Sequence, residues 1–528
     1  MNVAGALRPP YHCVRARGTL SALAGRMKIL VTGGTGVVGT GTVTELLRRR
    51  HEVVLVARHA NDEARQWPAG VVPRQGDVGD ARSIRGFADG CDAVLHITGI
   101  VEETPPDATF ERVNVGGTRN MIAEAQRAGV GRFVYVSSLG ADKGDSAYHR
   151  SKRDAETLTR GFAGNWTICR PGNVYGPGDE QISVLLRLVR GPSPIVPKVG
   201  DGDQQFQPLW WEDAAAALAQ VVERSDLGGA ELEIAGTDVT SQNDLLDRFH
   251  TITGRNVQSI ALPEFVATLG AKIVSAVGWD IKFTDDQLQM LREGNVIAAG
   301  RANALVTVLG IPPTPLDQGL RALCDLQPEQ LPESGIGALK RKRFWADIDG
   351  SKHTPESLFE LFCANFNEAM PVFVDAAAEP GATQSLEDGE TLTLALPLRG
   401  HVQIRVAEME ARRVTLLTLV GHPLAGAVRF LTEQRGAHIR FQAEVYDRAA
   451  NVIDLVAMRT IGDRLQDHTW SQVVEKVVAL SGGEASEGVE NETESLSEED
   501  AEAVTTWLKE ITMQRKREEN EERIAEPA

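Results

Sequence analysis

The chain has few cysteines and no long apolar run. Its 528 residues include five cysteines, at positions 13, 91, 169, 324 and 363, which lie far apart and never form a C-x-x-C pair. This spacing argues against a disulfide framework and against a cysteine-bound zinc ion, so no metal site is expected. No stretch of about eighteen consecutive apolar residues occurs, so no integral membrane segment is expected. Both absences favour a reducing, cytoplasmic location.

Basic residues are fewer than acidic residues, 55 against 73. The formal net charge is −18, which disfavours nucleic acid as a partner. Much of this charge is local, because the segment from Glu484 to the end holds fifteen acidic and five basic residues. The rest of the chain is therefore only mildly acidic, and its net charge says little about a functional site.

Both ends of the chain are predicted to lie outside the folded domains. Residues 1–26 contain arginines but no acids and no apolar core, which argues against a secretory signal. A disordered extension is favoured there, with a transit peptide as the alternative. Residues 483–528 are acidic and low in complexity, which predicts a mostly disordered tail. A capping-box spacing from Ser495 to Glu498, before apolar residues at helical spacing, leaves a short docking helix open.

Between residues 27 and 330, strand and helix patterns alternate. The segments KILVT, EVVLVA, CDAVLHIT and RFVYVSS are short apolar strands of the buried parallel type, and helical patterns separate them. This alternation predicts an α/β fold, a Rossmann-type doubly wound parallel sheet. After about residue 230 the rhythm changes, which indicates a small substrate-side subdomain. Its apolar helix at 263–279 is expected to form ordinary core, with the lining of an apolar substrate cleft or contact with a membrane as alternatives.

A second module follows a predicted linker at 331–343. Residues 344–482 begin with a helix capped by Thr354, continue through strand-like runs and close with a long helical segment. This order predicts a separate α+β domain. It is similar to the helix-grip fold, in which a curved sheet wraps a helix around an apolar cavity. Binding of an apolar ligand and a pure dimerisation or stability role both remain open for this domain.

A glycine-rich turn joins the first strand to the first helix. In TGGTGVVG the glycines fall at 33, 36 and 39, after a buried strand and before a helix. Glycine permits a tight turn and lets a pyrophosphate approach the N–H groups at the helix N-terminus. The sequence therefore predicts a dinucleotide site. Its predicted residues are Gly33, Thr35, Gly36, Val37, Val38 and Gly39.

The ends of the next strands indicate which dinucleotide binds. The second strand ends at Arg58 without a carboxylate, which favours NADP over NAD, although NAD remains the alternative. Asp77 and Val78 follow the third strand, where the acid either contacts the adenine or caps a turn. Thr98 and Gly99 end the fourth strand at the sheet's carboxyl edge, where such folds bind ligands.

Tyr148 and Lys152 lie four residues apart at the start of a helix, so they share one helix face. The preceding strand delivers Ser137 and Ser138 to the same edge of the sheet. A hydroxyl, a phenol and an ammonium that meet beside a nicotinamide suit carbonyl–alcohol chemistry. The ammonium favours the phenolate of the tyrosine, the serine orients the substrate oxygen, and the cofactor carries the hydride.

These motifs resemble the extended short-chain dehydrogenases/reductases of the NAD-dependent epimerase/dehydratase type. The matching segments are TGGTGVVG, GDVGD, NVGGTRNMI, YVSSLGA, YHRSK and RPGNVYGPGD, in this order within residues 27–330. The resemblance implies that Ser138, Tyr148 and Lys152 are the catalytic set. It further implies that Asn114 supports the lysine through water. Pro171, Asn173 and Val174 then lie beside the nicotinamide amide.

The predicted function is oxidation or reduction of a hydroxyl or carbonyl group on a small or amphipathic substrate. Sugar-nucleotide epimerases tend to carry an arginine where this chain has Gln204, Gln205 and Phe206, which favours a less charged substrate. An epimerase or dehydratase reaction at the same centre is the first alternative. The second is a non-catalytic dinucleotide sensor or assembly factor, similar to the short-chain-dehydrogenase-like subunit of respiratory complex I. A homo-oligomer or a protein partner bound through the C-terminal domain or tail also remains open.

Overall fold

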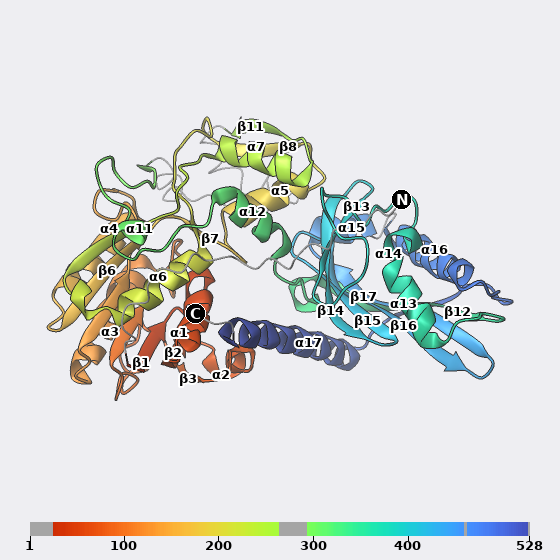
Figure 1. Cartoon of the computed structure of the whole chain (residues 1–528), viewed down its shortest axis with the longest axis horizontal. Coiled ribbons are helices and arrows are strands. Elements are labelled where there is room, and N and C mark those ends of the chain that lie inside the picture. Colours follow the sequence, from red (N-terminus) through yellow and green to blue (C-terminus); the bar gives the residue numbers. More distant parts are fainter. Residues whose placement is uncertain (1–24, 263–292, 459–461, 526–528) are drawn as a thin grey trace, which may run out of the picture.

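The computed structural model describes residues 25–262, 293–458 and 462–525. Nearly all of the predicted extension at 1–26 and the whole apolar helix at 263–279 lie outside the described residues. The described chain forms an N-terminal domain, a C-terminal domain and a long helix that runs between them (Figure 1). Within the described ranges, no helix combines the length and the apolar character needed to cross a membrane.

The N-terminal domain is built on a seven-stranded sheet in the order β10-β6-β5-β4-β1-β2-β3, with all pairs parallel. Because β1 lies between β4 and β2, the strand order reverses beside β1, and ligands bind at this reversal in doubly wound folds. The predicted Rossmann-type sheet is therefore confirmed. Its strands are β1 (Lys28–Thr32), β2 (Glu52–Ala57), β3 (Val71–Gln75), β4 (Ala93–His96), β5 (Arg132–Val136), β6 (Asn165–Pro171) and β10 (Ala230–Ile234).

Both faces of this sheet are buried, which explains why its strands are continuously apolar. Successive side chains of a strand point to opposite faces. Ile29 and Val31 of β1 accordingly join the core beneath α1 and α6, whereas Leu30 joins the core beneath α3 and α4. The helical segments around the sheet are α1 (Val37–Arg48), α2 (Ala60–Glu63), η1 (Ala64–Gln66), η2 (Glu111–Gly116), α3 (Gly117–Arg127), α4 (Ala147–Arg160), α6 (Trp211–Glu223) and η3 (Ser225–Leu227).

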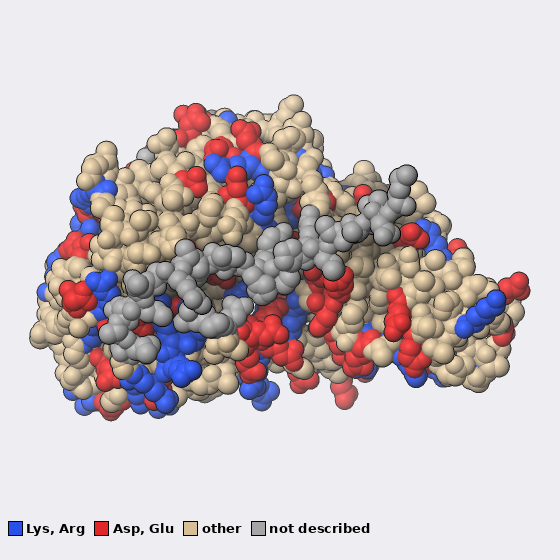
Figure 2. Space-filling model, in the orientation of Figure 1, with Lys and Arg blue, Asp and Glu red and all other residues tan. Residues whose placement is uncertain are grey.

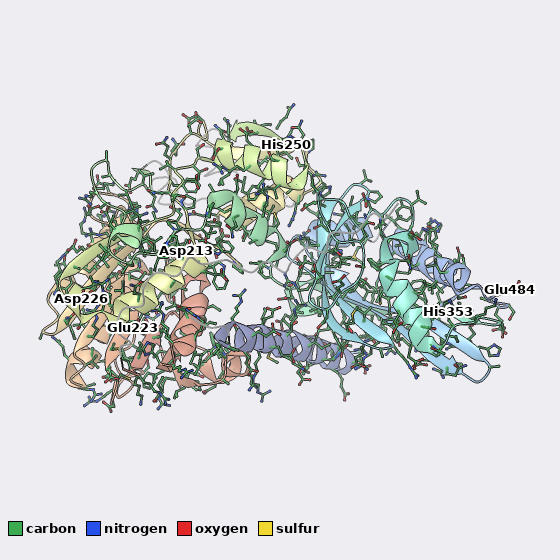
Figure 3. All side chains as sticks on the ribbon, viewed as in Figure 1. Asp213, Glu223, Asp226, His250, His353 and Glu484 are labelled. Atoms are coloured by element: carbon green, nitrogen blue, oxygen red, sulfur yellow. The ribbon has the colours of Figure 1, made fainter. Side chains whose placement is uncertain are left out.

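The substrate-side subdomain packs above the carboxyl edge of the sheet (Figure 1). Trp210 and Trp211 lie in its core beside Tyr175, with 5% and 6% of their surfaces exposed. Asp213 opens α6 and accepts hydrogen bonds from the backbone and side chain of Thr314 (Figure 3). The described elements are β7 (Val174–Tyr175), α5 (Ile182–Arg190), β8 (Ile195–Val199), β9 (Leu209–Trp210), α7 (Gln242–Thr253), β11 (Gln258–Leu262), α11 (Ala304–Thr307) and α12 (Leu316–Asp325).

The C-terminal domain contains a seven-stranded antiparallel sheet in the order β13-β14-β15-β16-β17-β12-β18. The predicted α+β domain with its antiparallel sheet is thus confirmed. Its first strand, β12, lies between β17 and β18. The strands are β12 (Ile336–Ile348), β13 (Thr391–Leu396), β14 (Gly400–Glu410), β15 (Arg413–Thr418), β16 (Leu424–Arg435), β17 (His438–Ala449) and β18 (Glu490–Ser495).

Helices cover one face of this sheet around an aromatic core. Phe362 of α13 contacts Phe430 and Phe441 of the sheet, with ring centroids 4.9 and 5.0 Å away. Val473 and Val477 of the long helix α16 complete this core. The helical segments of the domain are η4 (Pro332–Ser334), α13 (Pro355–Ala364), α14 (Phe366–Ala369), α15 (Val452–Ala457) and α16 (Asp463–Ser481).

The predicted linker at 331–343 differs from the structure, which places most of it in η4 and β12. The basic residues of this segment had suggested a solvent-exposed linker. In the fold, Arg341 and Arg343 lie opposite Glu494 and Glu492 of β18, so cross-strand ion pairs balance the cluster. The C-terminal domain therefore begins just after Gln330, and not at residue 344 as predicted.

The predicted disorder of residues 483–528 also differs from the structure. The segment contains β18 and α17 (Glu498–Ala525), a far longer helix than the short docking helix left open by the sequence. Leu508 of α17 is fully buried against Ala407, Leu417 and Ala427 of the C-terminal sheet. Acidic side chains gather over α17, beside basic side chains of the N-terminal domain (Figure 2). Burial of this apolar face outweighs the acidic composition that suggested disorder.

Candidate active site

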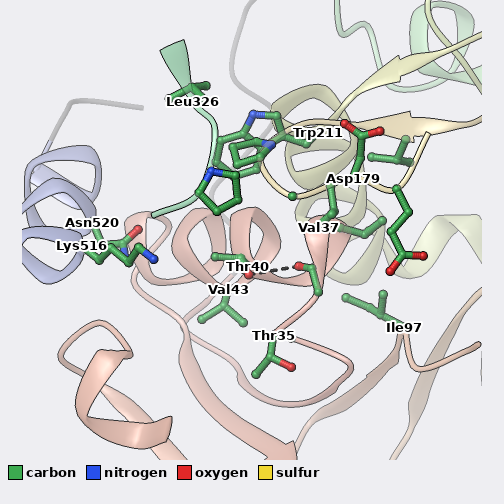
Figure 4. Close-up of a pocket in the computed structure, with 18 of the residues that line it drawn as sticks. Thr35, Val37, Thr40, Val43, Ile97, Asp179, Trp211, Leu326, Lys516 and Asn520 are labelled. Carbon is green, nitrogen blue, oxygen red and sulfur yellow. Dashed lines mark hydrogen bonds between the residues drawn. The ribbon is translucent and has the colours of Figure 1, made fainter. Parts of the chain in front are cut away.

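A cleft of about 1470 Å³ opens at the carboxyl edge of the N-terminal sheet (Figure 4). Its walls come from the glycine turn, the ends of β5 and β6, the start of α4 and the substrate-side subdomain. The predicted site residues that line the cleft are Thr35, Gly36, Val37, Val38, Gly99, Ser138, Tyr148, Lys152, Pro171, Asn173 and Val174. The fold thus brings the two predicted halves of the site together.

The three glycines of the turn have different roles. Gly33 has a φ of +71°, and a Cβ atom at this position would lie 2.6 Å from the backbone nitrogen of Thr98. A Cβ atom at Gly39 would lie 2.1 Å from the carbonyl oxygen of Gly33. At Gly36 the nearest heavy atom is 3.9 Å away. Gly33 and Gly39 therefore shape the turn, whereas Gly36 leaves open space beside the helix.

The N-terminus of α1 faces this open space. Gly36 is its N-cap, and no side chain of the described residues caps the first turn. Thr40 instead donates its hydroxyl hydrogen bond back to the carbonyl oxygen of Gly36, 3.0 Å away (Figure 4). Uncapped N–H groups and the helix dipole favour an anion at this end of a helix. The turn can therefore receive the diphosphate of a dinucleotide.

The residues predicted to contact the adenosine lie just outside the lining of the cleft. Arg58 follows β2, is exposed, and forms no ion pair with any described residue. Asp77 accepts a hydrogen bond from the backbone of Gly79 and pairs with Arg112, at 2.8 and 2.6 Å. These contacts agree with the alternative in which Asp77 caps a turn. Val78 is buried behind it.

Tyr148 and Lys152 lie on consecutive turns of α4, and both are buried. Ser146 caps this helix by accepting a hydrogen bond from the backbone of His149. The Lys152 ammonium donates to the carbonyl oxygen of Val136, 3.1 Å away, and lies 5.9 Å from the centroid of the Tyr148 ring. The cap and this contact fix the pair at the end of β5.

Burial moves both pKa values of the pair toward the neutral forms. Burial raises the pKa of Tyr148, and a hydrogen bond with Ser138 offsets part of this rise. It lowers the pKa of Lys152 to about 8, although the charge of Glu156 opposes this change. At neutral pH the phenol therefore keeps its proton, and most of the lysine is still charged.

The two serines at the end of β5 differ in their partners. Ser137 donates a hydrogen bond to Glu156, 2.6 Å away, and this carboxylate also binds the guanidinium of Arg170. Ser137 thus belongs to a buried structural network. Ser138 lines the cleft, and its hydroxyl donates a hydrogen bond to the carbonyl oxygen of Leu139, 3.3 Å away. Of the two serines, Ser138 is the one that acts on the pKa of Tyr148, which it lowers.

Asn114 lies behind Lys152. Its side chain bonds to the backbone N–H and carbonyl of Ile100 and to the hydroxyl of Ser151. A Cβ atom added at Gly99 would lie 2.7 Å from the Lys152 ammonium and 3.4 Å from the Asn114 side-chain oxygen. Only a glycine at 99 leaves room for both groups. Asn114 itself does not line the cleft.

The segment after β6 forms the far side of the cleft. The carbonyl of Pro171 accepts a hydrogen bond from Leu139, and the side-chain amide of Asn173 donates to Gln181, 2.6 Å away. The buried side-chain oxygen of Asn173 has no hydrogen-bond partner among the described residues. This oxygen and the neighbouring Val174 are available to a ligand.

Several residues that line the cleft were not among the predicted site residues. They come from the subdomain (Asp179, Gln181 and Trp211), from the C-terminal domain (Gly389, Thr391 and Arg405) and from α17 (Lys516, Asn520 and Arg523). They lie up to several hundred residues from the glycine turn, so no local pattern links them to it. Among the described residues, no group of three or more His, Cys, Asp or Glu side chains is placed to bind a metal ion.

Comparisons with known proteins agree with this geometry. Residues 29–235 match the NAD dependent epimerase/dehydratase family. The chain is 30% identical over 249 residues to a ceramide reductase of Caulobacter vibrioides, covering 46% of the chain and 77% of the relative. It is 31% identical over 213 residues to a 2-alkyl-3-oxoalkanoate reductase of Stenotrophomonas maltophilia, covering 36% and 64%.

Among solved structures, the chain is similar to the NADPH-dependent quinone oxidoreductase QOR2 of Escherichia coli complexed with NADPH. The sequence identity is 23%, the match covers 56% of this chain and 99% of that protein, and the TM-score is 0.46. The family match spans β1 to β10, the sheet that carries the cleft. The chain therefore belongs to the NAD-dependent epimerase/dehydratase family, a family of NAD(P)-dependent enzymes.

Proposed function

We propose that the protein is an NADPH-preferring oxidoreductase that interconverts a ketone and an alcohol on an amphipathic substrate. The observation that carries this proposal is the meeting of Ser138, Tyr148 and Lys152 in the same cleft as the uncapped N-terminus of α1. One part suits an anionic dinucleotide, and the other suits proton transfer to a substrate oxygen.

The residues of the cleft fit such a cofactor. Gly36 leaves room for a diphosphate against the backbone, whereas a side chain at this position would fill that room. Val37 and Val38 supply N–H groups at the helix terminus. Arg58, exposed at the end of β2, supplies the positive charge that a 2′-phosphate requires. Asn173 offers its buried oxygen to a carboxamide.

NADPH, when bound, supplies a hydride to the substrate carbon. Tyr148 donates its phenolic proton to the carbonyl oxygen, and its raised pKa keeps this proton in place at neutral pH. Ser138 donates a hydrogen bond to the same oxygen. The ammonium of Lys152 then stabilises the phenolate left on Tyr148. Since burial favours the protonated phenol, the residues suit the reduction of a ketone.

Two observations support a substrate with an alkyl chain. The relatives described above are named for ceramide and for 2-alkyl-3-oxoalkanoate, both of which carry alkyl chains. The chain also has Gln204, Gln205 and Phe206 where sugar-nucleotide enzymes tend to carry an arginine. A long-chain β-ketoacid or an acylated ketone therefore fits this site better than a nucleotide sugar.

The test combines cofactor binding with turnover. Binding of NADPH and NADH to the purified protein is measured by fluorescence, for the wild type and for Arg58→Ala. Long-chain ketones, short ketones and a nucleotide sugar are then added, and oxidation of the nicotinamide is followed. We expect tighter binding of NADPH, loss of this preference in Arg58→Ala, and turnover of a long-chain ketone.

The alternative outcomes are distinct. Tight binding without turnover of any ketone would contradict the proposed oxidoreductase and support a non-catalytic dinucleotide sensor. Conversion of the nucleotide sugar without net oxidation of the cofactor would support an epimerase or dehydratase. If neither dinucleotide binds, the proposed cofactor site itself is wrong.

A further inference from the structure

The C-terminal helix α17 is fixed to the C-terminal domain along its first part, up to Arg515. Leu508 is fully buried in the sheet, and the guanidinium of Arg429 lies 4.1 Å from the ring centroid of Trp507. Arg515 donates to the backbone carbonyls of Gly389 and Val406. Apolar burial and buried polar contacts together hold this part of α17 in a single position.

The last part of α17 reaches the N-terminal domain and lies against α1. The side-chain oxygen of Asn520 accepts a hydrogen bond from the hydroxyl of Thr44, 3.3 Å away. Arg523 lies over the indole ring of Trp211, 5.0 Å from its centroid, and its guanidinium is 3.6 Å from Glu212. Helix α17 is therefore held at both ends (Figure 1).

The face of α17 between these two attachments closes one side of the cofactor cleft. Lys516 and Asn520 line the same cleft as Gly36 and Val37, and both lie on the side of the helix that faces α1 (Figure 4). The side chain of Lys516 is 45% exposed, so it can reorient toward a ligand. The fold thus brings a flexible cation to the wall of this cleft beside α1.

The present partner of Lys516 is a buried carboxylate that a second cation also binds. The ammonium lies 3.0 Å from a carboxylate oxygen of Glu329. This carboxylate also pairs with Arg405, whose side chain is only 10% exposed. Burial raises the pKa of Glu329, but Lys516 and Arg405 outweigh it and bring the value down to about 2. If Lys516 moves to a phosphate, Arg405 stays paired with Glu329 and the phosphate replaces the carboxylate as the partner of the ammonium.

We propose that α17 completes the dinucleotide site and that Lys516 binds a phosphate group of the cofactor. This inference rests on the proposed function and adds a residue of the C-terminal segment to it. The C-terminal domain then has a defined role, because its sheet positions the helix that carries Lys516. The phosphate is either the diphosphate or the 2′-phosphate, and NADH, which lacks the latter, distinguishes them.

The first test measures dissociation constants of NADPH and NADH for the full-length wild type, Lys516→Ala, Lys516→Arg and Arg517→Ala. Arg517 is the matched control, because it carries the same charge on the same helix and, among the residues that the structure describes, its one ion pair is with Glu521 of α17. We expect Lys516→Ala to weaken NADPH binding about tenfold, and Lys516→Arg to restore most of it. Arg517→Ala is expected to bind as the wild type does.

The pattern of losses decides the proposal. Equal weakening of NADPH and NADH in Lys516→Ala assigns Lys516 to the diphosphate, and weakening of NADPH alone assigns it to the 2′-phosphate. Unchanged binding of both cofactors, or the same loss in Arg517→Ala, would overturn the proposal. A wild type that binds neither cofactor would instead disprove the proposed function, so the two failures are distinguishable.

A second measurement needs no variant. The wild type is acetylated with and without saturating NADPH, and modification of each lysine is read by mass spectrometry. We expect NADPH to protect Lys516, whereas Lys509, which pairs with Glu333, is modified equally in both samples. Equal modification of Lys516 with and without NADPH would overturn the proposal.

Discussion

The ammonium of Lys152 lies 5.9 Å from the centre of the Tyr148 ring, one helical turn along α4. Both side chains are buried, and the lysine is held by the carbonyl of Val136. The positive charge of the lysine thus lies over the face of the tyrosine ring. In the proposed mechanism, Tyr148 donates the proton and Lys152 supplies the charge that stabilises its phenolate.

Tyr148→Phe removes the proton donor and keeps the ring that packs against Phe110. We expect the dissociation constant of NADPH to stay within about twofold of the wild type, and the turnover number to fall about 10²–10⁴-fold. Equilibrium binding and single-turnover kinetics separate the two effects. Full activity in Tyr148→Phe would remove the tyrosine from the chemistry, since no other acid of the predicted set replaces it.

The pH dependence of reduction should report Lys152. Its pKa is lowered by burial to about 8, so the ammonium is present at neutral pH and is lost as the pH rises through that value. We expect kcat/KM to be level near pH 7 and to fall about tenfold per pH unit well above pH 8. Lys152→Arg keeps its charge at these pH values, so its residual activity should lack this fall. A profile that is unchanged in Lys152→Arg would contradict the assignment.

Two substitutions in the glycine turn should affect different properties. Gly39→Ala should lower the free energy of unfolding, and Gly36→Ala should lower the affinity for the dinucleotide. Gly39→Ala places a Cβ atom 2.1 Å from the backbone of Gly33, so we expect it to lower the free energy of unfolding by about 1–3 kcal/mol. Gly36→Ala meets nothing closer than 3.9 Å, so its stability should match the wild type while dinucleotide affinity falls. Denaturant unfolding and NADPH titration check both. A Gly36→Ala protein with full affinity would argue against a diphosphate at this turn.

A buried ion pair fastens the C-terminal domain to the substrate-side subdomain. Arg190 of α5 donates to both carboxylate oxygens of Glu379, at 2.7 and 2.6 Å, and its side chain is 5% exposed. Arg190→Ala leaves this carboxylate buried without its main partner, so we expect a loss of about 3–5 kcal/mol in the free energy of unfolding. Arg224→Ala, which breaks the exposed pair with Asp226, should cost far less, because water and salt screen that pair. Similar losses in both variants would contradict the role of the buried pair.

The parallel sheet and its glycine turn could be predicted because their signals are local. Strands buried on both faces must be continuously apolar, as Ile29, Leu30 and Val31 illustrate. The spacing of Tyr148 and Lys152 places both on one helix face whatever surrounds the helix. The resemblance of short segments to those of the family then indicated the remaining site residues.

Other features escaped prediction because their partners are distant in the sequence. The basic cluster at Arg341 and Arg343 resembled a linker until the glutamates of β18, about 150 residues later, supplied its cross-strand partners. The acidic tail resembled a disordered segment, although Leu508 and its neighbours bury an apolar face on a sheet formed a hundred residues earlier.

By itself, the sequence determined the doubly wound sheet, the dinucleotide turn and the pairing of Tyr148 with Lys152, since periodicity and glycine stereochemistry act over a few residues. Only the tertiary structure decided that Ser137 belongs to a buried structural network, because its hydroxyl binds Glu156, which pairs with the distant Arg170. Tertiary packing alone likewise brought Lys516 to the cofactor cleft, since a contact between the two ends of the chain depends on how both domains fold and dock.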